Sequence, residues 1–455
     1  MADEPVKVIK AGWLIDGFQD KPIRNGVLVI KGKSVETVAE DGAYEIPENA
    51  EVIDASNCSV MPGLFDCHVH LSTINACSFA NYRVGIFEVT PQLQSFYTLY
   101  HAHRCFEMGF TTIRDMGRES PYGHLTAEIC AVRDAIDLGL VPGPRVIACG
   151  RVVTTGSHHD MNIPRAMPRV PGATVTGPWA VRERVREYIR LGADVIKACV
   201  SGGSHAHDDP DSRNITQEEL NAMADEAHAF KRPIAAHCWT PEAHRMCLEA
   251  DIDTIEHMVF VDDETTEAIV AAGKPVTPTL LARTDHNIEI RREIGTAPSI
   301  LKKLKQVQPY CFEAFQKMHK AGVHIFMGTD TTMGPRMGEH AMELDLYVQH
   351  GMTPMDAIKT ATINAAQAVG FGDKLGTFEP GKLADFVAVE GDAIADITKL
   401  QDKKNIRMVA KEGGIYVDTL SPEHKYVIHP DPGQIQIIDN TEEPACLYIA
   451  KSATM

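Results

Sequence analysis

The sequence predicts an α/β protein in which a (β/α)8 barrel of the TIM type carries a small β-sandwich made from both chain ends. The middle of the chain holds about eight short apolar runs, each followed by a helical stretch, and eight strand–helix units close such a barrel. Both ends instead carry short apolar runs punctuated by glycine, which is typical of hairpins. We therefore expect a composite sandwich from residues 1–60 and 376–420, a barrel from 61–375, and an extension at 421–455 that contains no recognisable motif.

The expected strands follow in chain order. The apolar runs of the sandwich lie at 8–15, 26–30 and 34–39 in the first part and at 381–389 and 407–417 in the second. The apolar runs of the barrel end near His68, Asp115, Gly150, Lys197, His237, His257, Thr279 and Asp330.

Two helices between these runs carry start signals. Thr216 with Glu219 three residues later is a capping box, which predicts a helix start between the fourth and fifth strands. Thr353 followed by Pro354 places proline at the first position of another helix, which we expect to end at Gly370.

The composition excludes several classes of protein. The chain has 44 basic and 62 acidic residues and a formal net charge of −18, which argues against a nucleic-acid partner. No apolar run reaches the roughly 18 residues of a membrane helix, and the first residues lack a signal-peptide pattern. We therefore expect a cytoplasmic protein without membrane partners. Its 11 cysteines include no C-x-x-C pair, so we expect reduced, buried thiols and no thiolate zinc site.

The strongest local signal is the pair His68 and His70 at the end of the first barrel run. Side chains two apart on a strand point to the same face, so these imidazoles converge, as zinc-type ligands do. His101 and His103 share the same spacing but lie in a helical stretch, where positions two apart diverge by about 200° at about 3.6 residues per turn. We expect that second pair at the surface.

Four more strand ends carry ligand-type side chains. Lys197 closes the fourth run, His237 and His257 close the fifth and sixth, and Asp330 closes the eighth. A lysine buried in a barrel beside divalent cations would favour the neutral amine, which can react with carbon dioxide. The alternative is a lysine at the strand's edge that reaches solvent.

This ordered set resembles the metal-dependent amidohydrolase superfamily over nearly the whole chain. Further matching motifs are Pro62-Gly63-Leu64-Phe65-Asp66, Thr111-Thr112-Ile113-Arg114-Asp115, Gly143-Pro144-Arg145-Val146, Gly328-Thr329-Asp330 and Pro380-Gly381-Lys382-Leu383-Ala384-Asp385. The chain looks most like the branch that holds prolidase-like and ochratoxin-cleaving amidohydrolases and the phenylurea and molinate hydrolases.

The resemblance implies two divalent ions. His68 and His70 would bind the more buried ion together with Asp330, while His237 and His257 would bind the more exposed ion. Lys197, carboxylated on its side-chain nitrogen (N6), would bridge both. We expect zinc, although cobalt, manganese or iron would fit imidazole and carboxylate ligands.

The expected mechanism uses a metal-bound hydroxide that attacks a carbonyl, because two ions about 3.5–4 Å apart lower the pKa of a shared water. Asp330 would accept the proton and pass it to the leaving nitrogen. His158 would face the developing oxyanion, with His159 as the other candidate and two loop-surface histidines as the alternative. His159, His205, Trp239 and Arg283 are the expected substrate contacts.

The leading functional hypothesis is hydrolysis of a carbonyl–nitrogen bond in a small amide, urea or carbamate, as in the degradation of xenobiotics such as phenylurea and thiocarbamate herbicides. We expect a mainly apolar pocket for a neutral aromatic substrate, because the strand-end loops carry Ile74, Phe79, Tyr82, Phe87 and Trp239. The alternative is a dipeptidase or N-acyl-amino-acid carboxypeptidase, with Arg283 or Arg213 holding the free carboxylate. A non-catalytic binding homologue is the remote alternative. We also expect a homo-oligomer.

Overall fold

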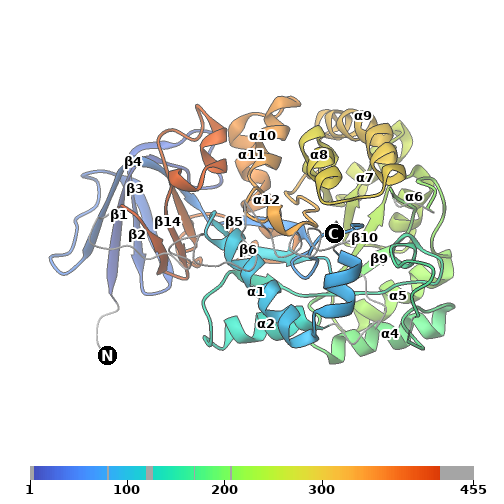
Figure 1. The fold of residues 1–455 in the computed structure, drawn as a ribbon. Helices are drawn as coiled ribbons and strands as arrows, with labels where there is room; N and C mark the ends of the chain where they lie inside the picture. The colour runs from blue at the N-terminus through green and yellow to red at the C-terminus, as the bar shows by residue number, and fades with distance from the viewer. Residues whose placement is uncertain (1–4, 79–80, 119–126, 169, 205–207, 421–455) are drawn as a thin grey trace.

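The structure, a computed structural model, describes residues 5–78, 81–118, 127–168, 170–204 and 208–420 (Figure 1). His205, Phe79 and the extension 421–455 lie outside the described residues. The described chain forms a sheet from both chain ends, at the left of Figure 1, and a barrel beside it.

Both chain ends contribute to one seven-stranded sheet. Its strands are β1 (Val6–Leu14), β2 (Ile23–Lys31), β3 (Ser34–Glu40), β4 (Glu51–Pro62), β13 (Phe386–Glu390), β14 (Ile406–Lys411) and β15 (Gly414–Asp418). They lie in the order β15-β14-β13-β4-β1-β2-β3, so the antiparallel pair of β4 and β13 joins the two ends of the chain.

The sheet folds over a common core, so that its two outer hairpins meet. Gly413, in the turn between β14 and β15, lies so close to Gly32, in the turn between β2 and β3, that an added Cβ would be 2.3 Å from the Gly32 carbonyl oxygen. Ser34 of β3 also forms an isolated bridge with Leu383. Residues of six strands, from Ile9 of β1 to Ala410 of β14, share one buried apolar cluster. The predicted sandwich from both chain ends is confirmed, built as a single sheet.

Seven of the eight expected barrel runs contain parallel strands. They are β5 (Leu64–Val69), β6 (Phe110–Asp115), β7 (Arg145–Ile147), β8 (Cys149–Arg151), β9 (Val195–Cys199), β10 (Ile234–Cys238), β11 (Thr254–His257) and β12 (Val276–Thr277). The third run is interrupted at Ala148, which separates β7 from β8 and divides the barrel into sheets of three and five strands.

The eighth run closes the barrel without forming a regular strand. Ile325 bridges to Val276 of β12 on one side. On the other side the Cys67 amide donates to the carbonyl of Met327 at 3.0 Å, and the Asp330 amide donates to that of His68 at 2.7 Å. These hydrogen bonds connect β12 to β5, so the predicted (β/α)8 architecture is confirmed.

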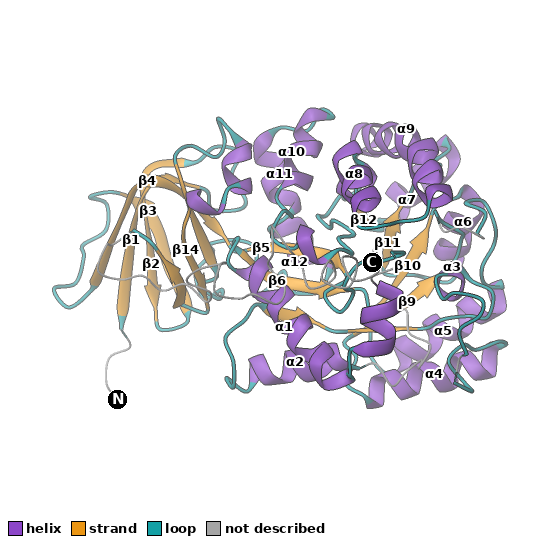
Figure 2. Cartoon of the chain, in the orientation of Figure 1, coloured by secondary structure: helices purple, strands orange, loops and turns teal. Residues whose placement is uncertain are grey.

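Helices surround the barrel (Figure 2). The α-helices are α1 (Pro91–Phe106), α2 (Glu128–Asp137), α3 (His158–Met161), α4 (Pro178–Arg190), α5 (Gln217–Ala229), α6 (Pro241–Glu249), α7 (Asp263–Ala272), α8 (Asp285–Glu293), α9 (Pro298–Ala321), α10 (Met342–Gln349), α11 (Pro354–Thr360) and α12 (Ile363–Ala368). Shorter or irregular helices are η1 (Asn81–Glu88), η3 (Leu281–Arg283), η4 (Gly334–Arg336), η5 (Ile397–Gln401) and η6 (Lys403–Asn405). Among the described helices, none has the length and apolar character that a membrane crossing requires.

The two predicted helix starts are present. Thr216 Oγ1 accepts the Glu219 amide at 3.2 Å and Glu219 Oε2 accepts the Thr216 amide at 2.9 Å, so the capping box starts α5. Thr353 caps α11, but the stretch expected to run on to Gly370 is broken into α11 and α12.

Thr216→Ala should lower the free energy of unfolding by about 1 kcal/mol, because the helix would lose the side-chain acceptor for its Glu219 amide. Urea denaturation would measure this change. Thr216→Ser keeps the hydroxyl and is the control, so an equal loss in both variants would contradict the capping role.

Candidate active site

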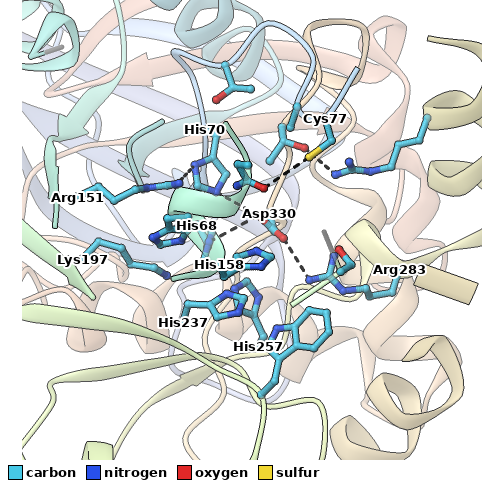
Figure 3. Close-up of a pocket in the computed structure, with 18 residues that line it drawn as sticks. His68, His70, Cys77, Arg151, His158, Lys197, His237, His257, Arg283 and Asp330 are labelled. Atoms are coloured by element: carbon cyan, nitrogen blue, oxygen red, sulfur yellow. Dashed lines mark hydrogen bonds and ion pairs between the residues drawn. The ribbon is translucent and has the colours of Figure 1, made fainter. Parts of the chain in front are cut away.

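The side chains expected to form the site meet in one pocket at the carboxyl ends of the barrel strands, the end at which barrel enzymes hold their active sites (Figure 3). The predicted residues that line it are His68, His70, His158, His159, Lys197, His237, Trp239, His257, Arg283 and Asp330. Two expected contacts are not among the lining residues. His205 is outside the described residues, and Arg213 is exposed and absent from the lining.

His68, His70 and Asp330 form the tightest group of ligand-type atoms. One such atom from each residue lies within 4.8 Å of the other two. Asp330 Oδ1 is 3.1 Å from His70 Nε2 and 3.7 Å from His68 Nε2. Asp330 has a positive φ of 54°, an uncommon conformation for a residue other than glycine, which turns the end of the eighth run toward β5.

His237 and His257 complete a contiguous group of four imidazoles. The His257 ring centroid is 4.7 Å from those of His68 and His237. The Gly202 carbonyl lies 3.1 Å from His237 Nε2 and can only accept, so this contact leaves the lone pair of His237 Nδ1 free. His257 Nδ1 lies 2.7 Å from Thr279 Oγ1.

Buried acceptors orient the first two histidines. His68 Nδ1 lies 2.6 Å from Glu256 Oε2, and His70 Nδ1 lies 2.5 Å from the carbonyl oxygen of Gly117. Arg114 Nη2 donates to Glu256 at 2.8 Å. Glu256 and the Gly117 carbonyl accept, so they favour a proton on Nδ1, and each Nε2 then keeps the lone pair that a metal ion needs, the usual arrangement of metal-binding histidines. Arg151 Nη2 also lies 2.8 Å from His70 Nδ1, and it donates to the same Gly117 carbonyl at 2.9 Å.

Lys197 is buried, with 1% of its surface exposed, and its Nζ has no hydrogen-bond partner among the described residues. Burial, aided by the positive charge of Arg151, lowers the pKa of Lys197 to about 8, although Glu256 opposes the shift. An unpaired buried ammonium is costly, whereas the neutral amine is the form that reacts with carbon dioxide. The alternative of a lysine that reaches solvent is wrong.

The donor set fits divalent metal ions of the zinc type. Four imidazoles and one carboxylate converge on the pocket, and these are the ligands that such ions prefer. The orphaned Nζ of Lys197 lies on the same lining. If this nitrogen carried a carboxyl group as a carbamate, Lys197 would offer two further oxygen ligands.

Both candidate oxyanion residues lie in the pocket, so the alternative that they are loop-surface histidines is wrong. His158 and His159 are 7% and 5% exposed. His158 Nδ1 is within hydrogen-bond distance of the Asp208 carboxylate, and the ring centroids of His158 and His237 are 4.8 Å apart in a stacked arrangement. His159 Nδ1 has no hydrogen-bond partner within the described parts of the chain, and burial lowers the pKa of His159 well below its usual range.

Three buried arginines line the pocket, Arg151, Arg283 and Arg291. In Figure 3, Arg283 lies on the other side of Asp330 from Arg151 and Lys197. Arg283 Nη2 is 3.4 Å from Asp330 Oδ2, and its guanidinium carbon is 5.2 Å from the centroid of the Trp239 ring. Arg291 Nη2 donates to Thr332 Oγ1 at 2.8 Å, while its Nε has no partner among the described residues. Arg291 was missed in the sequence, since nothing separates it from an ordinary arginine on an amphipathic helix.

The mainly apolar lining expected for an aromatic substrate is wrong for the described residues. Apart from Ala76, Cys77 and Trp239, the described lining consists of polar or ionisable side chains. Ile74 packs in a separate buried cluster, and Phe87 is 60% exposed. The pocket is therefore built for charged or strongly polar groups.

Fold and site together define a barrel protein whose pocket carries a metal-type ligand set. The sequence profile described as "Amidohydrolase family" matches residues 59–416, and the chain belongs to that family. Members of the family generally use divalent metals, and the predicted family is confirmed.

Similar proteins confirm the predicted branch. Ochratoxinase of Aspergillus niger is 32% identical over 440 residues, which cover 90% of this chain and 86% of that protein. A crystal structure of a Xaa-Pro dipeptidase with bound methionine matches with a TM-score of 0.81 and 32% identity, over 90% of this chain and 99% of that one. Phenylurea hydrolase B matches with a TM-score of 0.71 at 22% identity, over 93% and 99% of the two chains, and this likeness shows the fold alone.

The chain is therefore a hydrolytic enzyme that acts on amide-type bonds other than those of ordinary protein substrates. All six predicted ligand positions lie in one pocket, which removes the support for a non-catalytic homologue.

Proposed function

We propose that this enzyme hydrolyses the carbonyl–nitrogen bond of a small amide that carries a free carboxylate, such as an N-acyl amino acid or a dipeptide. The observation that carries the proposal is the placement of Arg283 and Arg291, both buried, in the same pocket as the metal-type ligands. A buried guanidinium binds a carboxylate through charge-assisted hydrogen bonds. The names of two relatives, an ochratoxinase and a Xaa-Pro dipeptidase, support the same choice.

The ligand set is proposed to divide between two divalent ions, most suitably zinc. His68, His70 and Asp330 would hold one ion and His237 and His257 the other, with carboxylated Lys197 bridging them. When bound, such ions polarise the substrate carbonyl and supply hydroxide near neutral pH.

The remaining steps belong to side chains of the pocket. Asp330 accepts the proton of the attacking water on Oδ2 and delivers it to the leaving nitrogen. His158, fixed by Asp208, or His159 donates to the carbonyl oxygen as negative charge develops on it. Arg291 and Arg283 hold the substrate carboxylate, which fixes the scissile carbonyl relative to the metal ligands.

A neutral urea or carbamate, the first hypothesis from the sequence, receives less support from the pocket, because apart from histidines the described lining offers it one aromatic side chain, Trp239, beside the buried guanidinium groups of Arg283 and Arg291. The deciding measurement compares kcat/KM for an N-acyl amino acid, for its uncharged C-terminal amide and for a phenylurea. We expect the acid to be preferred by more than about tenfold, or about 1.4 kcal/mol of transition-state binding. An equal rate for the amide, or a preference for the phenylurea, would overturn the proposal.

Arg291→Met should raise KM for the acid by about 10- to 100-fold, because a charge-assisted hydrogen bond contributes about 1.5–3 kcal/mol. The uncharged amide should be almost unaffected. Arg291 is a better test than Arg283, because Arg283 also contacts Asp330. Arg213→Met, at the exposed arginine outside the pocket, is the control and should leave both substrates unchanged.

A further inference from the structure

Two fully buried ionisable side chains, His340 and Glu343, lie outside the pocket at the start of α10. Both are 0% exposed, so neither can meet a substrate. Each one contacts a segment that carries residues of the site.

His340 contacts the metal side of the site through Asp66. His340 Nδ1 lies 2.5 Å from Asp66 Oδ2, and its Nε2 lies 3.2 Å from Cys105 Sγ of α1. Asp66 Oδ1 accepts the backbone amide of His68 at 3.0 Å and that of Thr329 at 3.2 Å, and Asp66 Oδ2 accepts the Thr329 hydroxyl at 2.7 Å. One carboxylate therefore connects β5 to the residue before Asp330.

Glu343 contacts the turn that carries Arg283. Its Oε1 accepts the Leu280 amide at 2.7 Å and its Oε2 accepts the Leu281 amide at 2.6 Å. These amides begin η3, which ends at Arg283. Both carboxylate oxygens are thus used to hold the start of one short turn.

Both contacts lie beside strained backbone. Asp330 and Thr279 each have a φ of 54°, a conformation that is an outlier for a β-branched residue such as Thr279. Such residues persist only when the surrounding structure fixes them. Thr329, before Asp330, is held by the carboxylate that His340 supports, and Leu280, after Thr279, is held by Glu343.

We propose that His340 and Glu343 are positioning residues with separate tasks. His340 holds His68 and Asp330 in metal-binding geometry through Asp66, and Glu343 holds Arg283 in carboxylate-binding geometry through the start of η3. The second task rests on the proposed function.

The test measures the thermal midpoint of each variant and its affinity for zinc by chelator competition. It also measures KM and kcat with two substrates, the N-acyl amino acid and its uncharged amide. We expect His340→Leu to weaken zinc binding by about 10- to 100-fold, as removal of outer partners of metal ligands does. His340→Gln, which can still donate to Asp66, should lose less. Glu343→Gln should change zinc affinity by less than about twofold but raise KM for the acid by about tenfold, with KM for the amide unchanged.

Matched controls separate these effects from a general loss of stability. His103→Gln removes a buried histidine of α1 that bonds the Pro142 carbonyl. Glu226→Gln removes a buried glutamate of α5 that is paired with Arg182 and Arg186 of α4. Both can lower the thermal midpoint but should leave zinc affinity and KM unchanged.

His340→Leu with wild-type zinc affinity, or with a loss no larger than that of His103→Gln, would overturn the metal-side role. Glu343→Gln with the wild-type preference for the acid would overturn the substrate-side role. A wild-type enzyme without that preference would refute the proposed function and the Glu343 role with it, while the zinc measurement on His340 would still decide the metal-side role.

Discussion

His68→Ala should lower kcat/KM by at least about 10³-fold and leave a folded protein that retains less metal. The side chain lies on the tightest ligand group, and its loss removes the imidazole whose Nδ1 is held by Glu256. Without metal, a water of pKa about 15.7 would have to attack in place of hydroxide formed near pH 7. Steady-state kinetics and metal analysis by mass spectrometry would measure both effects.

His286→Ala is the control for this variant, because His286 is an exposed histidine on α8. It should keep wild-type activity and metal content. Wild-type activity in His68→Ala, or in protein stripped of metal, would show that the pocket works without the ions for which its ligands are suited.

Lys197→Ala should lose metal and lower kcat/KM by a comparable factor, because its Nζ would supply the bridging ligand. In the proposed modification the neutral amine attacks carbon dioxide, a nitrogen–carbon bond forms and the amine loses a proton to solvent. Lys197→Arg keeps a positive charge but forms no carbamate, so it should fail as well. Added short carboxylic acids should restore part of the metal content and activity of Lys197→Ala, because they offer a carboxylate where the carbamate would lie.

Protein grown with ¹³C-labelled bicarbonate would give a carbamate carbon signal that is absent from Lys197→Arg. An unchanged metal content in Lys197→Ala would contradict the bridging role.

The metal-type residues could be predicted because their positions follow from strand geometry alone. His68 and His70 lie two apart on β5, and a residue that closes a parallel barrel strand faces the common pocket whatever lies elsewhere in the chain. The same argument predicts the positions of Lys197 and His237.

The supporting residues could not be predicted, because their partners are distant in sequence. Glu256 bonds His68, and Asp208 bonds His158. The partners of each pair lie on separate strands or loops, so no local sequence spacing could predict either contact. The expectation that His101 and His103 are exposed is wrong for a related reason. Their helix is correct, but both side chains are buried, and the two rings bond the carbonyls of Leu71 and Pro142.

The pairing of β4 with β13 has a consequence for how the chain is made. Pro62 pairs with Phe386, so the centre of the sheet requires a segment that leaves the ribosome after the whole barrel has been synthesised. Until then β4 presents an open edge whose last five residues, 58–62, are buried in the finished protein. Contacts so remote in sequence form slowly, and unpaired edges promote aggregation. We therefore expect nascent chains that stop short of residue 386 to depend on chaperones.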